Sequence, residues 1–139
     1  MYLLDTNVLS AMMRADVEPS VAAWLRGKPV EIMFTSAMCQ AEILAGLTMM
    51  ADGRRKDALT DAARAMFQED FLGRVLPFDA ACSASYARLF AITRRAGRTV
   101  PTIDLMIAAT AHRHDVSIVT RNTADFDPCG VPVINPWIR

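Results

Sequence analysis

The sequence has little lysine, no long apolar run and no excess charge of either sign, and each shortage excludes a class of protein. Only Lys28 and Lys56 among the 15 basic residues are lysines, and 15 acidic residues bring the formal net charge to zero. A balanced charge provides no overall field for gripping a polyanion, so nucleic-acid contact must rest on local patches or on bound metal. No apolar run reaches membrane-spanning length, so we expect no contact with a membrane.

Cysteine is also scarce, and its spacing is informative. Cys39, Cys82 and Cys129 are widely separated, odd in number and without a C-x-x-C pair. This pattern does not indicate a disulfide framework. The first predicted strand starts at residue 2, with no signal peptide ahead of it. We therefore expect a reduced, cytoplasmic protein.

The chain has the length and the apolar content of one folded domain. It contains 139 residues, of which 53% are hydrophobic, and neither a linker nor an internal repeat divides it. We expect a single domain over residues 1–139. Short apolar stretches alternate with segments of helical periodicity, which is typical of a parallel sheet covered on both faces. The predicted fold is a three-layer α/β/α sandwich with a central, mostly parallel sheet.

The predicted elements follow one another closely. Strands are expected at residues 2–4, 32–35, 74–78, 117–120 and 131–134. Helices are expected to begin near residues 6, 20, 36, 54, 80 and 103. Ser36 and Asp79 precede two of these helices as N-caps. The helix after Ser36 is expected to run to about Met50, with an apolar face that includes Cys39, Ile43, Leu44, Leu47 and Met50.

Acidic and polar residues stand where strands end and helices begin. Asp5 follows the first strand, Glu42 lies two turns into the helix after the second, and Asp104 lies in the first turn of a later helix. Asn122 follows the fourth strand, with Asp125 close behind. Ligands of open α/β sheets bind outside the carboxyl ends of the strands. These side chains are therefore predicted to share one crevice.

Two of these carboxylates need a partner. Asp104 alone could complement a helix dipole, and Glu42 alone could be solvated. Glu42, however, lies among Ala41, Ala45 and Gly46, which predicts a crowded place, and the helix of Asp104 is apolar nearly all round. Burying an unpaired charge is costly, and neither stretch contains a lysine. Converging carboxylates without cations indicate a bound divalent metal, and oxygen ligands favour Mg²⁺ or Mn²⁺ over Zn²⁺.

Four pieces of sequence, in this order and spacing, resemble the PIN-domain nucleases. They lie at residues 3–8, 41–42, 104–111 and 120–126, and the resemblance extends to Asn135, Pro136 and Trp137. Within that family the chain is most similar to the VapC toxins of the FitB-like branch. The resemblance implies a metal-dependent endoribonuclease that uses Mg²⁺ or Mn²⁺ and is the toxin component of a type II toxin–antitoxin system.

The resemblance also implies roles for individual residues. Asp5, Asp104 and Glu42 match the family's acidic metal ligands, while the fourth acidic position falls on the neutral Asn122. Asp125, three residues later, would compensate directly or through water. Glu42 or Asp125 would orient the attacking water, and in-line attack would leave a 5′-phosphate and a 3′-hydroxyl. Hydrogen-bond donors that support the metal-binding carboxylates are expected at Thr6, Asn7 and Thr120.

The expected partners follow from the same resemblance. They are an RNA substrate, a cognate antitoxin and a second copy of the chain in a homodimer, with DNA contacted only through the antitoxin. Two basic clusters, at residues 54–56 and 94–98, could contact RNA phosphates or lie as ordinary solvated helix ends.

Three other interpretations compete with the nuclease. A catalytically weak PIN domain, acting mainly as the antitoxin-binding partner in a DNA-bound regulatory complex, is favoured by Asn122. A phosphoacceptor receiver domain would need a lysine late in the chain, but no lysine follows Lys56. A dinucleotide-binding domain would need a glycine-rich turn after the first strand, and that turn is missing.

Overall fold

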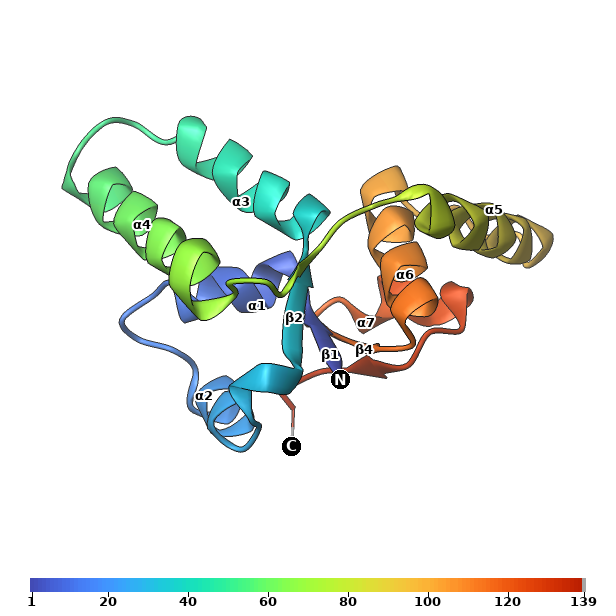
Figure 1. Ribbon diagram of the computed structural model, residues 1–139, viewed down its shortest axis with the longest axis horizontal. Helices are drawn as coiled ribbons and strands as arrows, with labels where there is room; N and C mark the ends of the chain where they lie inside the picture. The colour runs from blue at the N-terminus through green and yellow to red at the C-terminus, as the bar shows by residue number, and fades with distance from the viewer. Residues whose placement is uncertain (139) are drawn as a thin grey trace.

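Five short strands form the centre of the molecule, and helices lie on both sides of them (Figure 1). The computed structural model describes residues 1–138. The strands are β1 (Tyr2–Leu4), β2 (Met33–Ser36), β3 (Val75–Leu76), β4 (Ser117–Val119) and β5 (Val133–Ile134). They form one sheet in the order β3-β2-β1-β4-β5, and every neighbouring pair is parallel. The predicted three-layer α/β/α fold is confirmed, with a wholly parallel sheet and β1 at its centre.

The helices divide between the two faces of the sheet. In Figure 1, α1, α3 and α4 lie on one side of the strands, and α5 and α6 pack together on the other. The α-helices are α1 (Thr6–Met12), α2 (Pro19–Arg26), α3 (Ala37–Thr48), α4 (Arg54–Ala65), α5 (Ala80–Arg95), α6 (Thr102–His114) and α7 (Thr123–Phe126). Short 3-10 helices at Val30–Ile32 and Asp127–Cys129, and a π-helical turn at Met66–Asp70, complete the described chain.

Both predicted N-caps are confirmed. The Ser36 hydroxyl accepts a hydrogen bond from the Cys39 amide at 3.2 Å, and the Asp79 carboxylate accepts one from the Cys82 amide at 3.1 Å. Each such cap stabilises its helix by about 1 kcal/mol. The Ser36 cap starts α3 directly after β2, so it fixes where this helix leaves the carboxyl end of the sheet.

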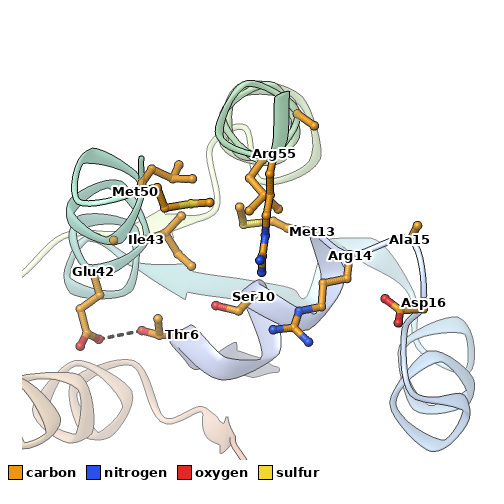
Figure 2. A pocket seen from close by; sticks show the side chains of 14 residues that line it. Thr6, Ser10, Met13, Arg14, Ala15, Asp16, Glu42, Ile43, Met50 and Arg55 are labelled. Atoms are coloured by element: carbon orange, nitrogen blue, oxygen red, sulfur yellow. Dashed lines mark hydrogen bonds between the residues drawn. The ribbon is translucent and has the colours of Figure 1, made fainter. Parts of the chain in front are cut away.

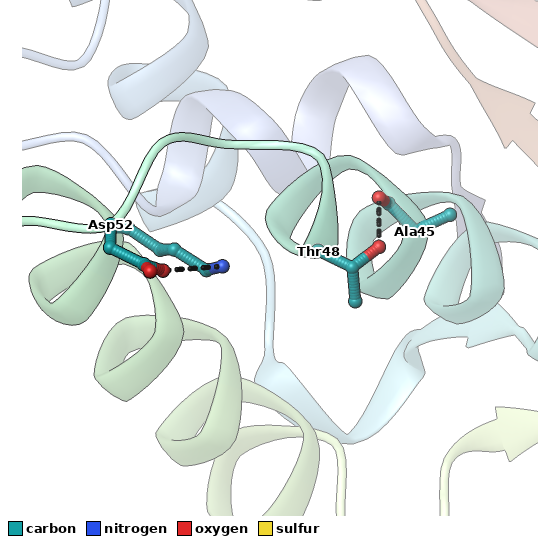
Figure 3. A network of polar contacts seen from close by, with 4 residues as sticks. Ala45, Thr48 and Asp52 are labelled. Carbon is teal, nitrogen blue, oxygen red and sulfur yellow. Dashed lines mark hydrogen bonds and ion pairs between the residues drawn. The ribbon is translucent and has the colours of Figure 1, made fainter.

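The connection from α3 to α4 is held by short local bonds (Figure 3). The Thr48 hydroxyl donates to the Ala45 carbonyl at 2.7 Å, one turn back in α3. The Lys56 ammonium pairs with Asp52 at 3.3 Å across the start of α4. One cation of the predicted basic cluster at residues 54–56 is therefore already engaged by a neighbouring carboxylate.

The core lies between the sheet and its helices. Leu3 and Leu4 of β1 and Ile118 of β4 are fully buried, because central parallel strands are covered on both faces. One residue of the predicted apolar face of α3 lies elsewhere: Leu44 is 48% exposed. The helix is apolar around much of its circumference, so spacing alone did not identify the side that faces solvent.

Strand lengths also differ from expectation. The third strand was predicted over residues 74–78 but pairs only at Val75 and Leu76. Pro77 lacks an amide proton and ends the ladder there.

No helix among residues 1–138 combines the length and the apolar character that crossing a membrane requires.

Candidate active site

The carboxyl ends of β1, β2 and β4 lie side by side at one edge of the sheet, with β1 in the middle. The Asp5 amide donates to the Val119 carbonyl at 3.0 Å, and the Thr35 hydroxyl donates to the Leu4 carbonyl at 2.8 Å. Because β1 has a neighbour on each side, the residue that follows it is enclosed. Asp5 is only 5% exposed, at the strand tip where the sequence pattern predicts it.

Both oxygens of the Asp5 carboxylate accept hydrogen bonds. Oδ1 accepts from the Thr6 amide at 2.8 Å and from the Cys39 thiol, whose Sγ is 3.8 Å away. Oδ2 accepts from the Thr120 hydroxyl at 2.7 Å and from Asn7 Nδ2 at 3.4 Å. Burial raises the pKa of Asp5, and the bonds from Thr120 and Thr6 offset part of that rise. The donors therefore fix one rotamer of a carboxylate that has no cation beside it.

The Thr120 hydroxyl is the hub that joins β4 to this network. While it donates to Asp5, its oxygen accepts from Asn7 Nδ2 at 3.0 Å and from the Asn122 amide at 3.1 Å. Asn7 in turn accepts from the Arg121 amide at 3.1 Å through Oδ1. Two segments separated by more than a hundred residues are thus locked together around Asp5. Thr6, Asn7 and Thr120, which we expected to support the carboxylates, all contact an acidic side chain.

Glu42 reaches the same place from α3, but its surroundings differ from expectation. The Thr6 hydroxyl donates to Glu42 Oε1 at 2.7 Å, which Figure 2 shows as a dashed line. The prediction of a crowded neighbourhood is wrong, because Ala41, Glu42, Ala45 and Gly46 are all exposed. A Cβ atom added at Gly46 would meet nothing within 4 Å beyond its chain neighbours and the backbone of its own helix. The small residues of α3 leave room for a groove instead of a close helix contact.

Asp104 lies in the first turn of α6 and is half-buried. Its pKa is raised to about 6, first by burial and then by the negative charges of Asp5, Asp125 and Glu42. Four carboxylates therefore repel one another at this point. Between residues 1 and 138 there are two salt bridges, Lys56–Asp52 and Arg64–Asp61, and neither neutralises any of these four.

A cleft lies beside Asp5, Glu42 and Asp104, and Asn122 and Asp125 occupy different positions relative to it. Asn122 lines it, and its backbone amide is bound to Thr120. Asp125 lies in α7, near enough to raise the pKa of Asp104, but it does not line the cleft. The structure therefore brings all five predicted site residues to one region, with Asp125 at its margin.

The cleft contains residues that the sequence did not single out. Its volume is about 690 Å³, and its lining includes Ser10, Arg14, Asp16, Glu18, Arg121 and Trp137 beside the predicted residues. Five lining residues are acidic and two are arginines. Arg121 could have been found, because it stands between Thr120 and Asn122, whereas Trp137 was noted only as part of a family ending.

A second cavity of about 670 Å³ adjoins the first (Figure 2). It lies between α1, α3 and α4 and shares Thr6, Ser10, Arg14, Asp16 and Glu42 with the acidic cleft. The rest of its wall is mostly apolar and includes Met13, Ile43, Leu47, Met50 and Leu59. We call it the α3–α4 groove.

The carboxylates match a divalent metal in chemistry and in charge. They offer oxygen ligands only, as Mg²⁺ and Mn²⁺ prefer, and they lack cationic partners. Within residues 1–138, no three Asp, Glu, His or Cys side chains converge closely enough to hold an ion in the conformation described. Asp5 is fixed by its donors, but Glu42 is exposed and Asp104 half-buried. Holding an ion through three of these side chains would therefore require some of them to move.

Comparison with known proteins places this arrangement in a family. The family model described as "PIN domain" matches residues 2–127. "VapC ribonuclease Y4jK" of Sinorhizobium fredii is 37% identical over 137 residues, covering 99% of this chain and 98% of that protein. "Toxin FitB" of Neisseria gonorrhoeae is 36% identical over 137 residues, with 99% of each chain covered.

A solved structure agrees with these relatives along the whole chain. The structure titled "Structure of FitAB bound to IR36 DNA fragment" contains a chain that is 36% identical, with a TM-score of 0.92, covering 99% of this chain and 96% of that one. The resemblance to the VapC and FitB proteins is thus confirmed in sequence and in fold. The chain belongs to the PIN-domain family.

Proposed function

We propose that this chain is an Mg²⁺- or Mn²⁺-dependent endoribonuclease and the toxin of a type II toxin–antitoxin pair, folded as a single domain over residues 1–139. The observation that carries the proposal is the group of unneutralised carboxylates beyond the carboxyl end of β1, the central strand. Burial and, after it, the negative charges of Asp5, Asp125 and Glu42 raise the pKa of Asp104 to about 6, and a bound cation would offset both effects. The names of the full-length relatives, a VapC ribonuclease and a FitB toxin, support the assignment.

Asp5, Asp104 and Glu42 would hold the metal. When bound, it would lower the pKa of a coordinated water and neutralise charge on the scissile phosphate. Thr120, Asn7 and the Thr6 amide keep Asp5 in one orientation, so this ligand needs no reordering.

The attacking water would be oriented by polar residues around the metal. Glu42 or Asp125 would orient it and accept its proton, since both carboxylates are exposed and near Asp104. Asn122 offers an amide oxygen to the same cleft without adding negative charge. In-line attack on the phosphate would then leave a 5′-phosphate and a 3′-hydroxyl.

The α3–α4 groove supports the partner part of the proposal. An apolar segment of a cognate antitoxin would lie against Ile43, Leu47 and Met50, with Arg55 at the edge for an acidic side chain. A homodimer completes the proposed assembly, and DNA would be reached through the antitoxin. The related FitAB assembly was solved on a DNA fragment.

A second function is favoured by two features. The resemblance assigns the neutral Asn122 to the family's fourth acidic position. In addition, no three acidic side chains of the described chain converge in the conformation seen. A PIN domain with weak catalysis, acting mainly as the antitoxin-binding partner in a DNA-bound regulatory complex, would have these properties.

The deciding experiment is cleavage of a pool of structured RNAs by the purified protein without antitoxin, in Mg²⁺, Mn²⁺ or EDTA. Asp5→Asn and Asp104→Asn are the test variants, and Asp61→Asn is the matched control because Asp61 lies exposed on α4 in a surface ion pair. We expect metal-dependent cuts that both test variants abolish and the control retains. Intact RNA from folded protein with either metal would contradict the nuclease and favour the binding role, and Asn122→Asp would then be assayed for restored cleavage.

A further inference from the structure

We propose that Arg121 binds a phosphate of the RNA next to the scissile one and that Trp137 holds the Arg121 guanidinium in place for this contact. The proposal rests on the ribonuclease function proposed above and adds a substrate-binding group to it. Both side chains line the acidic cleft, although they come from the end of β4 and from the chain beyond β5.

The backbone of Arg121 is anchored to the catalytic network. Its amide donates to Asn7 Oδ1 at 3.1 Å, and Asn7 also donates to Asp5 and to Thr120. The residues on either side, Thr120 and Asn122, belong to the same set of bonds. The position of Arg121 is therefore fixed relative to Asp5, so a phosphate bound by this side chain would lie at a defined distance from the reacting centre.

The side chain of Arg121 is ordered as well. Its guanidinium carbon lies 4.9 Å from the centre of the Trp137 ring, a cation–π contact. Trp137 is held in turn: its amide donates to Asn135 Oδ1 at 2.9 Å, and its carbonyl accepts from the Ser20 hydroxyl at 3.3 Å. An arginine held in advance loses less rotamer freedom on binding than an unrestrained one.

The acidic lining of the cleft explains why RNA binding there would need a cation such as Arg121. Five acidic residues line it, so an approaching RNA backbone is repelled except where a cation stands. Arg14 is the other cation of the lining, but it lies exposed in the bend after α1, and its side chain has no hydrogen bond or ring contact within the described chain. Arg121 is exposed too and forms no salt bridge within residues 1–138, so its five donors remain available to a phosphate.

The test is RNA binding measured by fluorescence anisotropy. The probe is the labelled structured-RNA pool in Mg²⁺, and every protein carries Asp104→Asn so that the RNA stays intact. We expect Arg121→Gln to raise Kd about tenfold. Because one phosphate contact is lost, the slope of log Kd against log[KCl] should decrease by about 0.7, the value for one contact to a single strand.

The matched control is Lys28→Gln. Lys28 is also a cation over an aromatic ring, 5.3 Å from the centre of Trp24, but it lies after α2, outside the cleft and outside both basic clusters. This variant should leave both Kd and the salt slope unchanged. Equal binding by the Arg121→Gln protein and its parent would overturn the assignment while leaving the ribonuclease intact. No binding by the Asp104→Asn parent, together with no cleavage by the unsubstituted protein, would overturn both.

Trp137 is tested as a positioning residue by a double-mutant cycle. Trp137→Leu should raise Kd about threefold, and Trp137→Phe should restore binding because a phenyl ring still supports the guanidinium. In the Arg121→Gln background, Trp137→Leu should have no further effect. An equal loss with and without Arg121 would overturn the positioning role, since Trp137 would then act on the RNA or on the fold directly.

Discussion

The fold disfavours the ionised form of Asp104 and so raises its pKa. Its pKa is about 6 in the folded protein against 3.8 for an ordinary aspartate, because burial and three other carboxylates disfavour ionisation. The folded state therefore binds a proton more tightly than the unfolded chain does. Stability from this residue is present below about pH 4 and is lost as the pH rises through 6.

We predict that Asp104→Asn stabilises the metal-free protein above pH 7. The full shift corresponds to about 3 kcal/mol, but Asp104 is only half-buried, and solvent screening reduces the expected gain to about 1 kcal/mol. Urea unfolding in EDTA at pH 4 and pH 7.5 measures it, and the gain should vanish at pH 4. A gain of equal size at both pH values would show that charge repulsion is not its cause.

The buried hydroxyl of Thr120 should also affect the stability of the fold. Thr120→Val should cost about 2–3 kcal/mol in the free energy of unfolding, since Asp5 Oδ2 loses its closest donor and two further donors lose their acceptor. Thr120→Ser keeps the hydroxyl and should recover most of this loss. Urea unfolding measures both variants. A valine variant as stable as the serine variant would contradict the claim that the hydrogen bonds of the Thr120 hydroxyl stabilise the fold.

At the scale of elements, α3 combines a core face with an exposed face that borders the groove. Gly46 lies within this helix, is exposed, and has open space where a Cβ would stand. Gly46→Ala should therefore raise the free energy of unfolding by about 0.5–1 kcal/mol, because glycine loses the most backbone entropy on entering a helix. Denaturant unfolding checks the gain, and a destabilised alanine variant would mean that the groove closes on this position in solution.

The elements of the fold could largely be predicted from local patterns. Ser36 and Asp79 mark the helix starts because capping depends on adjacent atoms. The buried face of α3 could be predicted from Cys39, Ile43 and Leu47, but the exposure of Leu44 could not, because Leu44 has the same apolar character as these neighbours. The contact between Arg121 and Trp137 could not be predicted either, since it depends on how two segments meet in the folded protein.

At the scale of the whole molecule, a zero net charge conceals a strongly acidic cleft. The chain has 15 residues of each sign, yet five acidic residues and two arginines line this one surface. Unneutralised charge of this kind destabilises the folded state, and a bound cation should relieve it.

We predict that Mn²⁺ or Mg²⁺ raises the melting temperature relative to EDTA. A ligand at a hundred times its Kd stabilises the folded state by about 2.7 kcal/mol. Asp5→Asn should abolish the thermal shift, and the surface variant Asp61→Asn should keep it. Unchanged melting of the unsubstituted protein over a wide range of metal concentration would argue against the carboxylates as a metal site.

The strand order has a consequence for synthesis of the protein on the ribosome. Asp5 is among the first residues made, but its neighbouring strand β4 and its donor Thr120 come more than a hundred residues later. A growing chain that ends before β4 cannot assemble the cleft, whatever its N-terminal part has folded into. A nascent copy of the proposed nuclease therefore has no complete catalytic site until most of its translation is finished.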